Sequence, residues 1–260
     1  MKITIITVAY NSARTIGDTL RSVAAQSHAD IEHIVIDGAS TDGTLDVVRR
    51  EGQHVSRVVS QPDRGIYDAM NKGLALATGD AVGFLNSDDM FATEHSVAHL
   101  AATLESNAVD AVFGDLVFVD AKDTQRVVRY WRAQPHLPGA SASGWMPPHP
   151  TLYVRLDALR RSGGFSLNYR LQADFELTLR LFEIQKIRAS YLPEVLVRMR
   201  MGGATTGSLR NIIRGNVEAS RACRSNGFPG GLRFIARKMA SRLPQFLTRP
   251  QPAIIPSELP

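Results

Sequence analysis

Short apolar runs alternate with amphipathic helical patterns along the first part of the chain. The apolar runs cover 3–9, 31–36, 55–59 and 81–85, and the helical patterns lie between them. Strands that alternate with helices are typical of βαβ units, in which the strands pair in parallel and the helices cover the sheet. The pattern therefore predicts an α/β fold with a mostly parallel central sheet flanked by helices.

The second half of the chain has a different pattern. It predicts a strand pair at 112–119 and 127–131, then a Pro- and Gly-rich loop at 134–150, and a helix at 173–183. Loops of this length inside a compact domain are usually functional lids or disordered segments. We expect one domain over residues 1–207, built from a first half (1–110) and a more variable second half (111–207).

The composition of the chain indicates the cellular compartment in which the protein is found. With 260 residues, of which 44% are hydrophobic, the chain can bury a large core. Its one cysteine, Cys223, excludes an internal disulfide and fits a reducing compartment. The apolar run at 3–9 is too short for a signal sequence, and no window approaches the roughly 20 apolar residues of a membrane span. We expect a cytoplasmic protein.

Basic charge is concentrated near the C-terminus. Residues 208–260 carry nine Lys and Arg against Glu218 and Glu258, a net charge of +7, whereas the rest of the chain carries −2. We expect a basic helical extension over 208–249 and a disordered Pro-rich tail over 250–260.

The last helix of this extension is predicted to be amphipathic. One face carries apolar residues and the flanks carry basic ones: Leu232, Ile235, Ala236, Met239 and Leu243, with Arg233, Arg237, Lys238 and Arg242. Such a helix suits the inner face of a membrane that contains anionic lipid, and the alternative is a helix packed on the domain with solvated arginines. Nucleic acid is not expected as a partner, because the extension has few interleaved aromatic residues.

Acidic residues follow three of the predicted strands. Asp37 comes after the second, Asp63 after the third, and Asp88 with Asp89 after the fourth. The carboxyl ends of parallel strands meet at one edge of a sheet, where open α/β folds bind ligands. Each aspartate alone is more often a turn or cap residue, but together they favour a divalent metal, Mg²⁺ or Mn²⁺, that also binds a substrate phosphate.

Four segments resemble glycosyltransferase family 2. They are Thr7-Val8-Ala9-Tyr10-Asn11, the run from Ile36 to Thr44, the run from Asp63 to Gly73, and Leu85-Asn86-Ser87-Asp88-Asp89. The third of them is similar to the branch that decorates bacterial surface polysaccharides and glycolipids. The resemblance covers residues 1 to about 205, and its motifs occur in the family's order.

The resemblance implies a GT-A fold, in which a Rossmann-like half binds a nucleotide-sugar (UDP-, GDP- or dTDP-sugar) and a second half binds a glycan or lipid-linked acceptor. The implied donor-binding residues are Thr7, Ala9, Asn11, Asp37, Asp63, Asn71, Asn86 and Ser87. Asn86-Ser87-Asp88 corresponds to the family's DxD, so Asp88 would hold the metal on the diphosphate. Because Asn86 replaces the usual aspartate, one ligand charge is lost, and Asp89 is a second candidate ligand.

The family's inverting reaction also implies residues in the second half. A single in-line displacement needs a base for the acceptor hydroxyl, and the matching residue is Asp174, whose alternative role is a helix cap. His149 matches a histidine beside the acceptor site, and Trp145 is either an acceptor platform or a core residue. Arg198 and Arg200 lie where relatives have a loop over the diphosphate. The Gln-x-x-Arg-Trp signature of processive members is absent, which predicts addition of single sugars.

Three other classes of protein are alternatives to a glycosyltransferase. A Rossmann dehydrogenase is excluded because no G-x-G-x-x-G follows the first strand. A sugar-phosphate nucleotidyltransferase would need a Gly-rich basic loop at that position, where Ala9-Tyr10-Asn11-Ser12 stands. A non-catalytic nucleotide-sugar-binding protein is the third alternative.

Overall fold

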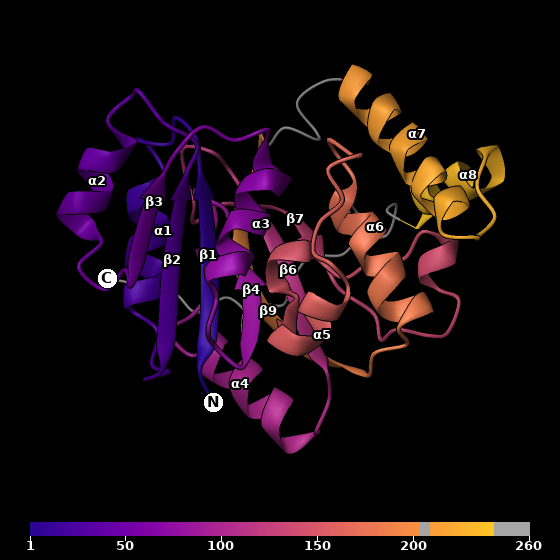
Figure 1. Ribbon diagram of the computed structural model, residues 1–260, viewed down its shortest axis with the longest axis horizontal. Coiled ribbons are helices and arrows are strands. Elements are labelled where there is room, and N and C mark those ends of the chain that lie inside the picture. Colours follow the sequence, from indigo (N-terminus) through magenta and orange to yellow (C-terminus); the bar gives the residue numbers. More distant parts are fainter. Residues whose placement is uncertain (203–208, 242–260) are drawn as a thin grey trace.

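The protein was analysed as a computed structural model that describes residues 1–202 and 209–241. These residues form one nine-stranded sheet covered by helices (Figure 1). The strands are β1 (Ile3–Ala9), β2 (Ile31–Asp37), β3 (Arg57–Ser60), β4 (Ala81–Phe84), β5 (Met90–Phe91), β6 (Ala111–Val119), β7 (Val127–Trp131), β8 (Tyr153–Arg155) and β9 (Ala189–Arg200).

The helices agree with the predicted pattern within a few residues. The α-helices are α1 (Ile16–Ala24), α2 (Thr44–Glu51), α3 (Ile66–Leu76), α4 (Ser96–Ser106), α5 (Leu156–Arg161), α6 (Ala173–Leu179), α7 (Leu209–Ser225) and α8 (Leu232–Ala240). Two short 3₁₀ turns, η1 (Ser141–Ser143) and η2 (His149–Thr151), lie in the loop predicted at 134–150. A π-helical segment, η3 (Arg180–Ile184), continues α6.

The first four strands form the predicted parallel sheet. β1 lies between β2 and β4, β3 pairs with β2, and all of these pairs are parallel. Ala9 and Asp37, the last residues of β1 and β2, are register partners. The polar segments that follow these strands therefore start from the same edge of the sheet, as the sequence predicts.

The rest of the sheet is mixed. β8 is antiparallel to β4 and β6, β6 is parallel to β9, and β5 closes the order β3-β2-β1-β4-β8-β6-β9-β5 as an antiparallel partner of β9. Neither β5 nor β9 was predicted. β5 has only two residues, and β9 contains Pro193 and Glu194, so neither presents an uninterrupted apolar run.

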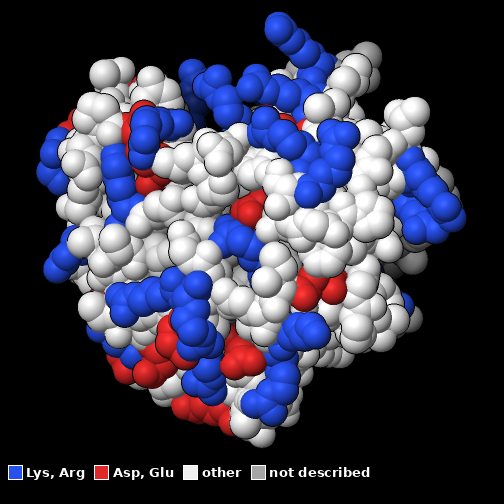
Figure 2. Space-filling view, turned by 45° about the vertical axis from the view of Figure 1, so that its right-hand side comes forward, with Lys and Arg blue, Asp and Glu red and all other residues white. Residues whose placement is uncertain are grey.

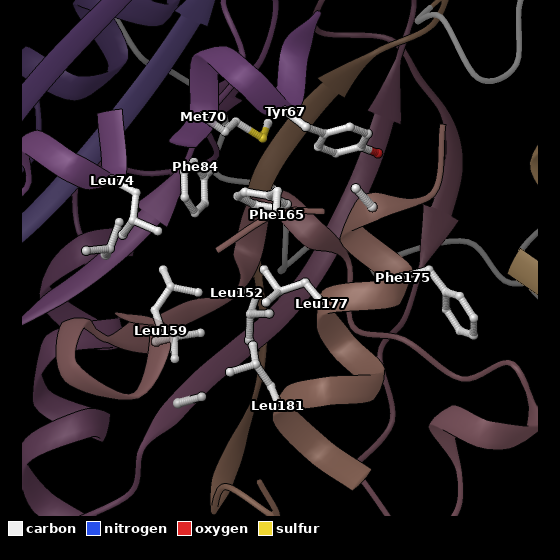
Figure 3. Close-up of a cluster of buried hydrophobic side chains, with 14 of the residues drawn as sticks. Tyr67, Met70, Leu74, Phe84, Leu152, Leu159, Phe165, Phe175, Leu177 and Leu181 are labelled. Carbon is white, nitrogen blue, oxygen red and sulfur yellow. The ribbon is translucent and has the colours of Figure 1, made fainter. Parts of the chain in front are cut away.

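Two large apolar clusters cover the sheet. One includes Ile6, Phe84 and Phe165 with residues of α3 and α6 (Figure 3), and the other includes Ile5, Leu100 and Tyr153. The α3 helix lies directly on β1 because it carries Gly73 at the crossing. A Cβ there would lie 2.4 Å from Cγ2 of Ile6, so a larger residue would displace the helix.

The loop at 134–150 is anchored to the domain. The Glu183 carboxylate accepts hydrogen bonds from the backbone N–H groups of Gly139 and Ser141, both at 2.8 Å. The Trp145 ring contacts Phe113 and Phe182 in edge-to-face geometry. Trp145 therefore packs against the core cluster, which is one of the two roles that the sequence left open for it.

The C-terminal helices pack on the second half of the domain. α7 contributes Ala219, Ala222 and Cys223 to the large core cluster, and Phe234 of α8 joins them. Of the predicted apolar face of α8, Leu232 and Met239 are exposed, at 85% and 55%, whereas Ile235 packs partly against the core cluster.

Lys238 corrects the prediction of solvated basic flanks on α8. Its side chain is buried, and its Nζ donates to Oε1 of Gln172 at 2.6 Å. Leu243, Arg242 and the predicted tail at 250–260 lie outside the described residues.

Candidate functional site

The loops after β1 and β2 are hydrogen-bonded to each other at the carboxyl edge of the sheet, where open α/β folds bind ligands, and we call the turns at this edge the crevice. The backbone N–H of Gly38 donates to the carbonyl of Ala9 at 2.8 Å. Asn11 has a positive φ of 49°, and its Oδ1 accepts from the N–H of Thr41 at 3.0 Å. Asn11 thus joins the two loops, and it remains exposed to solvent.

Asp37 and Asp63 meet at Gly38. The buried Asp37 carboxylate accepts from the N–H of Ser40 at 3.0 Å and from Oγ of Ser60 at 2.6 Å. The Asp63 carboxylate lies against Gly38, where a Cβ would be 2.5 Å from its Oδ2. The loops after β2 and β3 are therefore in contact, and a side chain at position 38 would displace the Asp63 carboxylate.

The turn after β4 carries the DxD-like residues. Ser87 donates from Oγ to Oγ of Ser12 at 2.8 Å, which ties this turn to the loop after β1. Asp88 is partly exposed, and burial raises the pKa of its carboxyl. Oδ1 of Asn86 is buried and accepts no hydrogen bond from any described residue. An unpartnered amide oxygen near a carboxylate is a reasonable pair of ligands for an oxygen-preferring cation.

This pair is incomplete as a metal site. Within residues 1–202 and 209–241, no group of three or more His, Cys, Asp or Glu side chains could hold a metal ion. A cation at Asn86 and Asp88 would need further oxygen ligands from a bound phosphate and water, which is common for Mg²⁺.

Asp89 lies beneath the turn, and this placement does not support its prediction as a metal ligand. Its side chain is fully buried, its Oδ2 accepts from Nδ2 of Asn86 at 3.3 Å, and its Oδ1 accepts from the N–H of Arg200 at 3.3 Å. Burial, together with the charge of Asp88, raises the pKa of Asp89 well above its ordinary value.

Arg200 also lies inside the protein, where it fixes the turn. Its Nε donates to the backbone carbonyl of Asp88 at 3.1 Å, and its Nη2 forms an ion pair with Asp18 of α1. The guanidinium is therefore occupied by protein groups, which corrects its expected place in a loop over the diphosphate. Gly202 is the last described residue before the undescribed segment 203–208.

Thr7 also differs from its expected role. Its side chain is fully buried, and its Oγ1 lies 2.9 Å from Nε2 of His33. Nδ1 of His33 lies 3.1 Å from Nε2 of His54. Thr7 therefore contributes to the interior of the sheet, and Ala9, two residues later, ends the strand at the crevice.

Asp174 is held by a tyrosine that the sequence did not single out. Oδ1 of Asp174 accepts from the Tyr67 hydroxyl at 3.1 Å and from the N–H of Phe175 at 2.8 Å. Figure 3 shows the Tyr67 hydroxyl on the side of α6. Tyr67 lies in the third family-like segment, and that membership is the one sequence signal that could have identified it.

His149 lies beside the same group. Its ring stacks on Phe84 with centroids 5.8 Å apart and meets the edge of Phe165 at 5.7 Å. Burial lowers the pKa of His149, while the charge of Asp174 opposes this shift. Nε2 of His149 is buried and has no hydrogen-bond partner in the described residues. A histidine that is neutral and partnerless in this position can accept or donate one hydrogen bond to a bound molecule.

Asn71 pins the loop that carries Phe165. Its Nδ2 donates to the carbonyl of Phe165 and its Oδ1 accepts from the N–H of Phe165, both at 2.8 Å. Both ends of the amide are thus used within the protein. This corrects the prediction that Asn71 contacts the donor and makes it a support for the aromatic group around His149.

The start of α6 separates two acidic side chains. Asp174 is the second residue of the helix and is partly exposed, whereas Glu176 is buried. Arg180 forms a bidentate ion pair with Glu176, with N–O distances of 2.8 and 2.7 Å. Arg180 therefore stabilises the helix that carries Asp174.

The comparisons with known proteins agree with this arrangement. Residues 4–163 match the family model of glycosyl transferase family 2, and the chain belongs to this family. It is 27% identical over 216 residues to a PGL/p-HBAD biosynthesis glycosyltransferase of Mycobacterium bovis, covering 79% of each chain. It is 31% identical over 184 residues to an uncharacterized glycosyltransferase of Mycobacterium tuberculosis, covering 68% of each. The chain is therefore a glycosyltransferase.

Solved structures confirm the GT-A type of fold. S. aureus TarS 1–349 in complex with UDP-GlcNAc superposes with a TM-score of 0.66 at 18% identity, over 94% of this chain and 73% of that one. The mannosyltransferase PcManGT from Pyrobaculum calidifontis, in complex with GDP-Man and Mn²⁺, superposes with a TM-score of 0.66 at 22% identity, over 92% of this chain and 68% of that one.

Proposed function

We propose that this protein is an inverting, metal-dependent glycosyltransferase that adds single sugars from a nucleotide-sugar to a hydroxyl of a glycan or lipid-linked acceptor. The observation that carries the proposal is the pairing of two sites around Phe84. Asn86 and Asp88 of the crevice follow Phe84 by two and four residues in the chain. His149 of the Asp174 group stacks on the Phe84 ring. A donor crevice beside a carboxylate suited to act as a base is what single displacement requires.

The donor half would bind the nucleotide-sugar through its loops. Ala9, Asn11 and Asp63 would face the nucleoside, and the buried Asp37 would hold the loop that carries Ser40 in place. Asp88 and the free Oδ1 of Asn86 would hold Mn²⁺ or Mg²⁺ on the diphosphate. The metal supplies charge neutralisation for the departing nucleoside diphosphate. Support for a metal comes from the Mn²⁺ complex of the mannosyltransferase neighbour.

The acceptor half would supply the base. Oδ2 of Asp174 accepts no hydrogen bond from a described residue, since Tyr67 and Phe175 both donate to Oδ1. That oxygen can accept the proton of the acceptor hydroxyl as the hydroxyl oxygen attacks the anomeric carbon. His149 would orient the acceptor through Nε2, and the Phe84–Phe165 surface would exclude water from the reacting groups.

Product analysis tests this proposal. UDP-, GDP- and dTDP-sugars are incubated with the protein, Mn²⁺ and a membrane lipid extract, and the released nucleotide is identified. We expect one nucleoside diphosphate and a glycosylated product of inverted anomeric configuration. The Asp174→Asn variant should release at least roughly 100-fold less, the scale of a lost general base, and Asp157→Asn, an exposed aspartate, is the matched control. Release of pyrophosphate would instead establish a nucleotidyltransferase, and binding without turnover would establish a non-catalytic module.

We also propose that the C-terminal helices place the protein at the cytoplasmic face of an anionic membrane. No helix in the described part of the chain is long and apolar enough to span a bilayer. At 100° per residue, Arg210, Ile213, Arg214, Val217, Arg221 and Arg224 share one exposed face of α7. Lys and Arg predominate over the upper part of the molecule in Figure 2, the side of the C-terminal helices. Basic and apolar residues on one face favour anionic lipid surfaces.

The contacts of α8 decide how this membrane proposal is tested. Deleting α8 would remove the buried Phe234 and Lys238, so a truncation would disturb the Asp174 helix as well. Exposed residues give a cleaner variant, Ile213→Glu with Val217→Glu. Binding to vesicles that contain one third phosphatidylglycerol should fall at least roughly tenfold, without loss of nucleotide binding. Unchanged vesicle binding would contradict the membrane proposal and leave the transferase proposal untouched.

A further inference from the structure

A second cavity lies outside the donor crevice, between α1, β5 and the turn that joins β6 to β7. Its volume is about 310 Å³, at the lower end of the range for small-molecule sites. Its walls include Asp18 and Arg21 of α1, Ala25 directly after that helix, Met90 and Phe91 of β5, and Arg198 of β9. None of the residues assigned above to the crevice or to the Asp174 group lines it.

Arg198 is the unusual member of this wall. Its side chain is only 6% exposed, and its Nη2 donates to the carbonyl of Thr124 at 2.6 Å and to Oε1 of Gln125 at 2.8 Å. Both partners are neutral. Its Nε is buried without any hydrogen-bond partner, and no described carboxylate forms an ion pair with it. This location corrects the expectation that Arg198 belongs to a loop over the diphosphate.

A buried guanidinium without a counter-ion is costly. Burial lowers the pKa of Arg198, and Asp123 opposes this shift only from beyond ion-pair distance. Nη2 is occupied by Thr124 and Gln125, and Nη1 makes no hydrogen bond to a described residue, so Nη1 is free to donate to an oxygen of a carboxylate or phosphate. The neighbouring charges are internally paired, since Asp18 binds Arg200 and Arg21, and Arg21 also binds Glu51. An anion in the cavity would supply the missing charge.

The cavity is connected to the Asp88 turn through contacts of Arg200. Asp18, in its wall, forms the ion pair with Arg200, and Met90, also in its wall, has its Sδ 4.0 Å from Nη2 of Arg200. The same Arg200 holds the carbonyl of Asp88 at 3.1 Å. A ligand that displaces Asp18 or Met90 would therefore shift the residue that fixes the turn.

We propose that this cavity is a binding site for a small organic anion, a carboxylate or phosphate ester held by Arg198, and that its occupation adjusts donor binding through Asp18 and Arg200. Met90, Phe91 and Ala25 give it an apolar wall suited to the carbon skeleton of such a molecule. Only the second half of the proposal rests on the proposed transferase function.

Direct binding tests the first half. Succinate and inorganic phosphate are titrated calorimetrically into the full chain at constant ionic strength, with chloride as the reference anion. We expect at least one of them to bind, with the stronger probe identifying a carboxylate or a phosphate site. Arg198→Met should weaken binding at least roughly tenfold, the scale of a charged hydrogen bond. The matched control is Arg126→Met, an exposed arginine beside the same turn. No binding of either probe, or equal binding by Arg198→Met, would overturn the proposal.

A second variant guards against loss of folding in Arg198→Met. Ala25→Leu fills part of the cavity with a larger side chain without changing any charge, and it should also abolish binding of the probe. Competition distinguishes this cavity from the diphosphate site. The probe should still bind to Asp88→Asn and in the presence of saturating UDP, with its Kd changed by no more than the few-fold factor that coupling to donor binding requires. Complete displacement by UDP, or loss of binding in Asp88→Asn, would mean that the anion occupies the donor crevice and would overturn the proposal.

Kinetics tests the second half. The probe should change the KM for the donor by at least roughly threefold in the wild type and should leave the KM of Arg198→Met unaffected. A probe that binds without changing the wild-type KM would overturn the coupling alone. A protein that binds the probe but transfers no sugar would overturn the proposed function and leave the anion site standing.

Discussion

The donor crevice and the Asp174 group differ in how the chain assembles them. The crevice is made of short turns that directly follow parallel strands, and most of its hydrogen bonds stay within those turns or join adjacent ones. The Asp174 group depends on contacts across long stretches of sequence, such as Tyr67 with Asp174 and Asn71 with Phe165. Motifs indicate residues of both sites, but the contacts that hold Asp174 and Phe165 in place become visible only in the structure.

The C-terminal helices extend this contrast. Oε2 of Glu218 in α7 accepts the N–H groups of Arg170 and Leu171, at 3.0 and 2.8 Å. Lys238 of α8 binds Gln172, the residue at the start of α6. These helices therefore support the segment that leads into Asp174. The predicted basic extension is therefore bonded to the predicted second half of the domain at residues 170–172.

The largest expected effect is on the base. Asp174→Asn keeps the shape of the side chain but removes the proton acceptor, so kcat should fall at least roughly 100-fold while the donor Kd stays within about twofold. Stopped-time product assays and calorimetry with the donor nucleotide measure the two quantities. Equal losses in both would mean that the two regions are not functionally separate.

Tyr67→Phe sharpens the comparison at the long-range contact. The variant keeps the ring packed against Phe165 but removes the hydrogen bond to the Asp174 carboxylate. We expect kcat to fall roughly tenfold, since hydrogen bonds to charged groups contribute about 1.5–3 kcal/mol, with an unchanged donor KM. A normal kcat would show that Tyr67 does not position the base.

Lys238→Met tests the support from α8. The variant retains an apolar chain over the Phe175 ring but loses the donor to Gln172. We expect kcat to fall a few-fold, again without a change in donor KM. Arg237→Met, at an exposed position of the same helix, is the matched control and should behave as the wild type. Equal kcat in both variants would confine α8 to a packing role.

The smallest expected effect is on stability, inside the sheet below the crevice. Burial, together with His54, lowers the pKa of His33 to about 3. The unfolded chain binds a proton at His33 below about pH 6.5 and the folded chain does not, so stability should fall between pH 6.5 and 3, by up to about 1.4 kcal/mol per unit. His33→Gln should flatten this slope in urea unfolding at pH 7, 6 and 5. An unaltered slope, as expected for the exposed His95→Gln, would contradict the assignment.

Much of the fold and of the crevice could be predicted because strand periodicity and turn chemistry are local signals. The predictions failed where side-chain direction matters. Thr7 and Asp89 were assigned by motif to the crevice, but the pleat of β1 and the turn after β4 direct both side chains inward. Arg198 and Arg200 were assigned to a loop, yet both belong to β9, whose pairing with β6 and β5 no local pattern revealed.

The burial of Lys238 is another feature that local sequence patterns do not predict. A lysine beside an apolar helical stripe normally remains solvated, and no local pattern around Lys238 indicates that its side chain is buried. Burial is favourable here because Oε1 of Gln172 accepts a hydrogen bond from Nζ of Lys238, and the centre of the Phe175 ring lies 5.0 Å from the same Nζ. Both partners are about 65 residues distant in the chain, so only the packed structure brings them together.

The most direct test of the account is the thermal stability of the protein with nucleotide-sugars, with and without Mn²⁺. One of UDP-, GDP- or dTDP-sugar should raise Tm in the presence of the metal, by roughly 5 °C or more at 100 times Kd. The increase should disappear in Asp88→Ala and persist in Asp174→Asn. An increase in Tm that does not depend on the metal, or that is also found in Asp88→Ala, would contradict the assignment of the donor site.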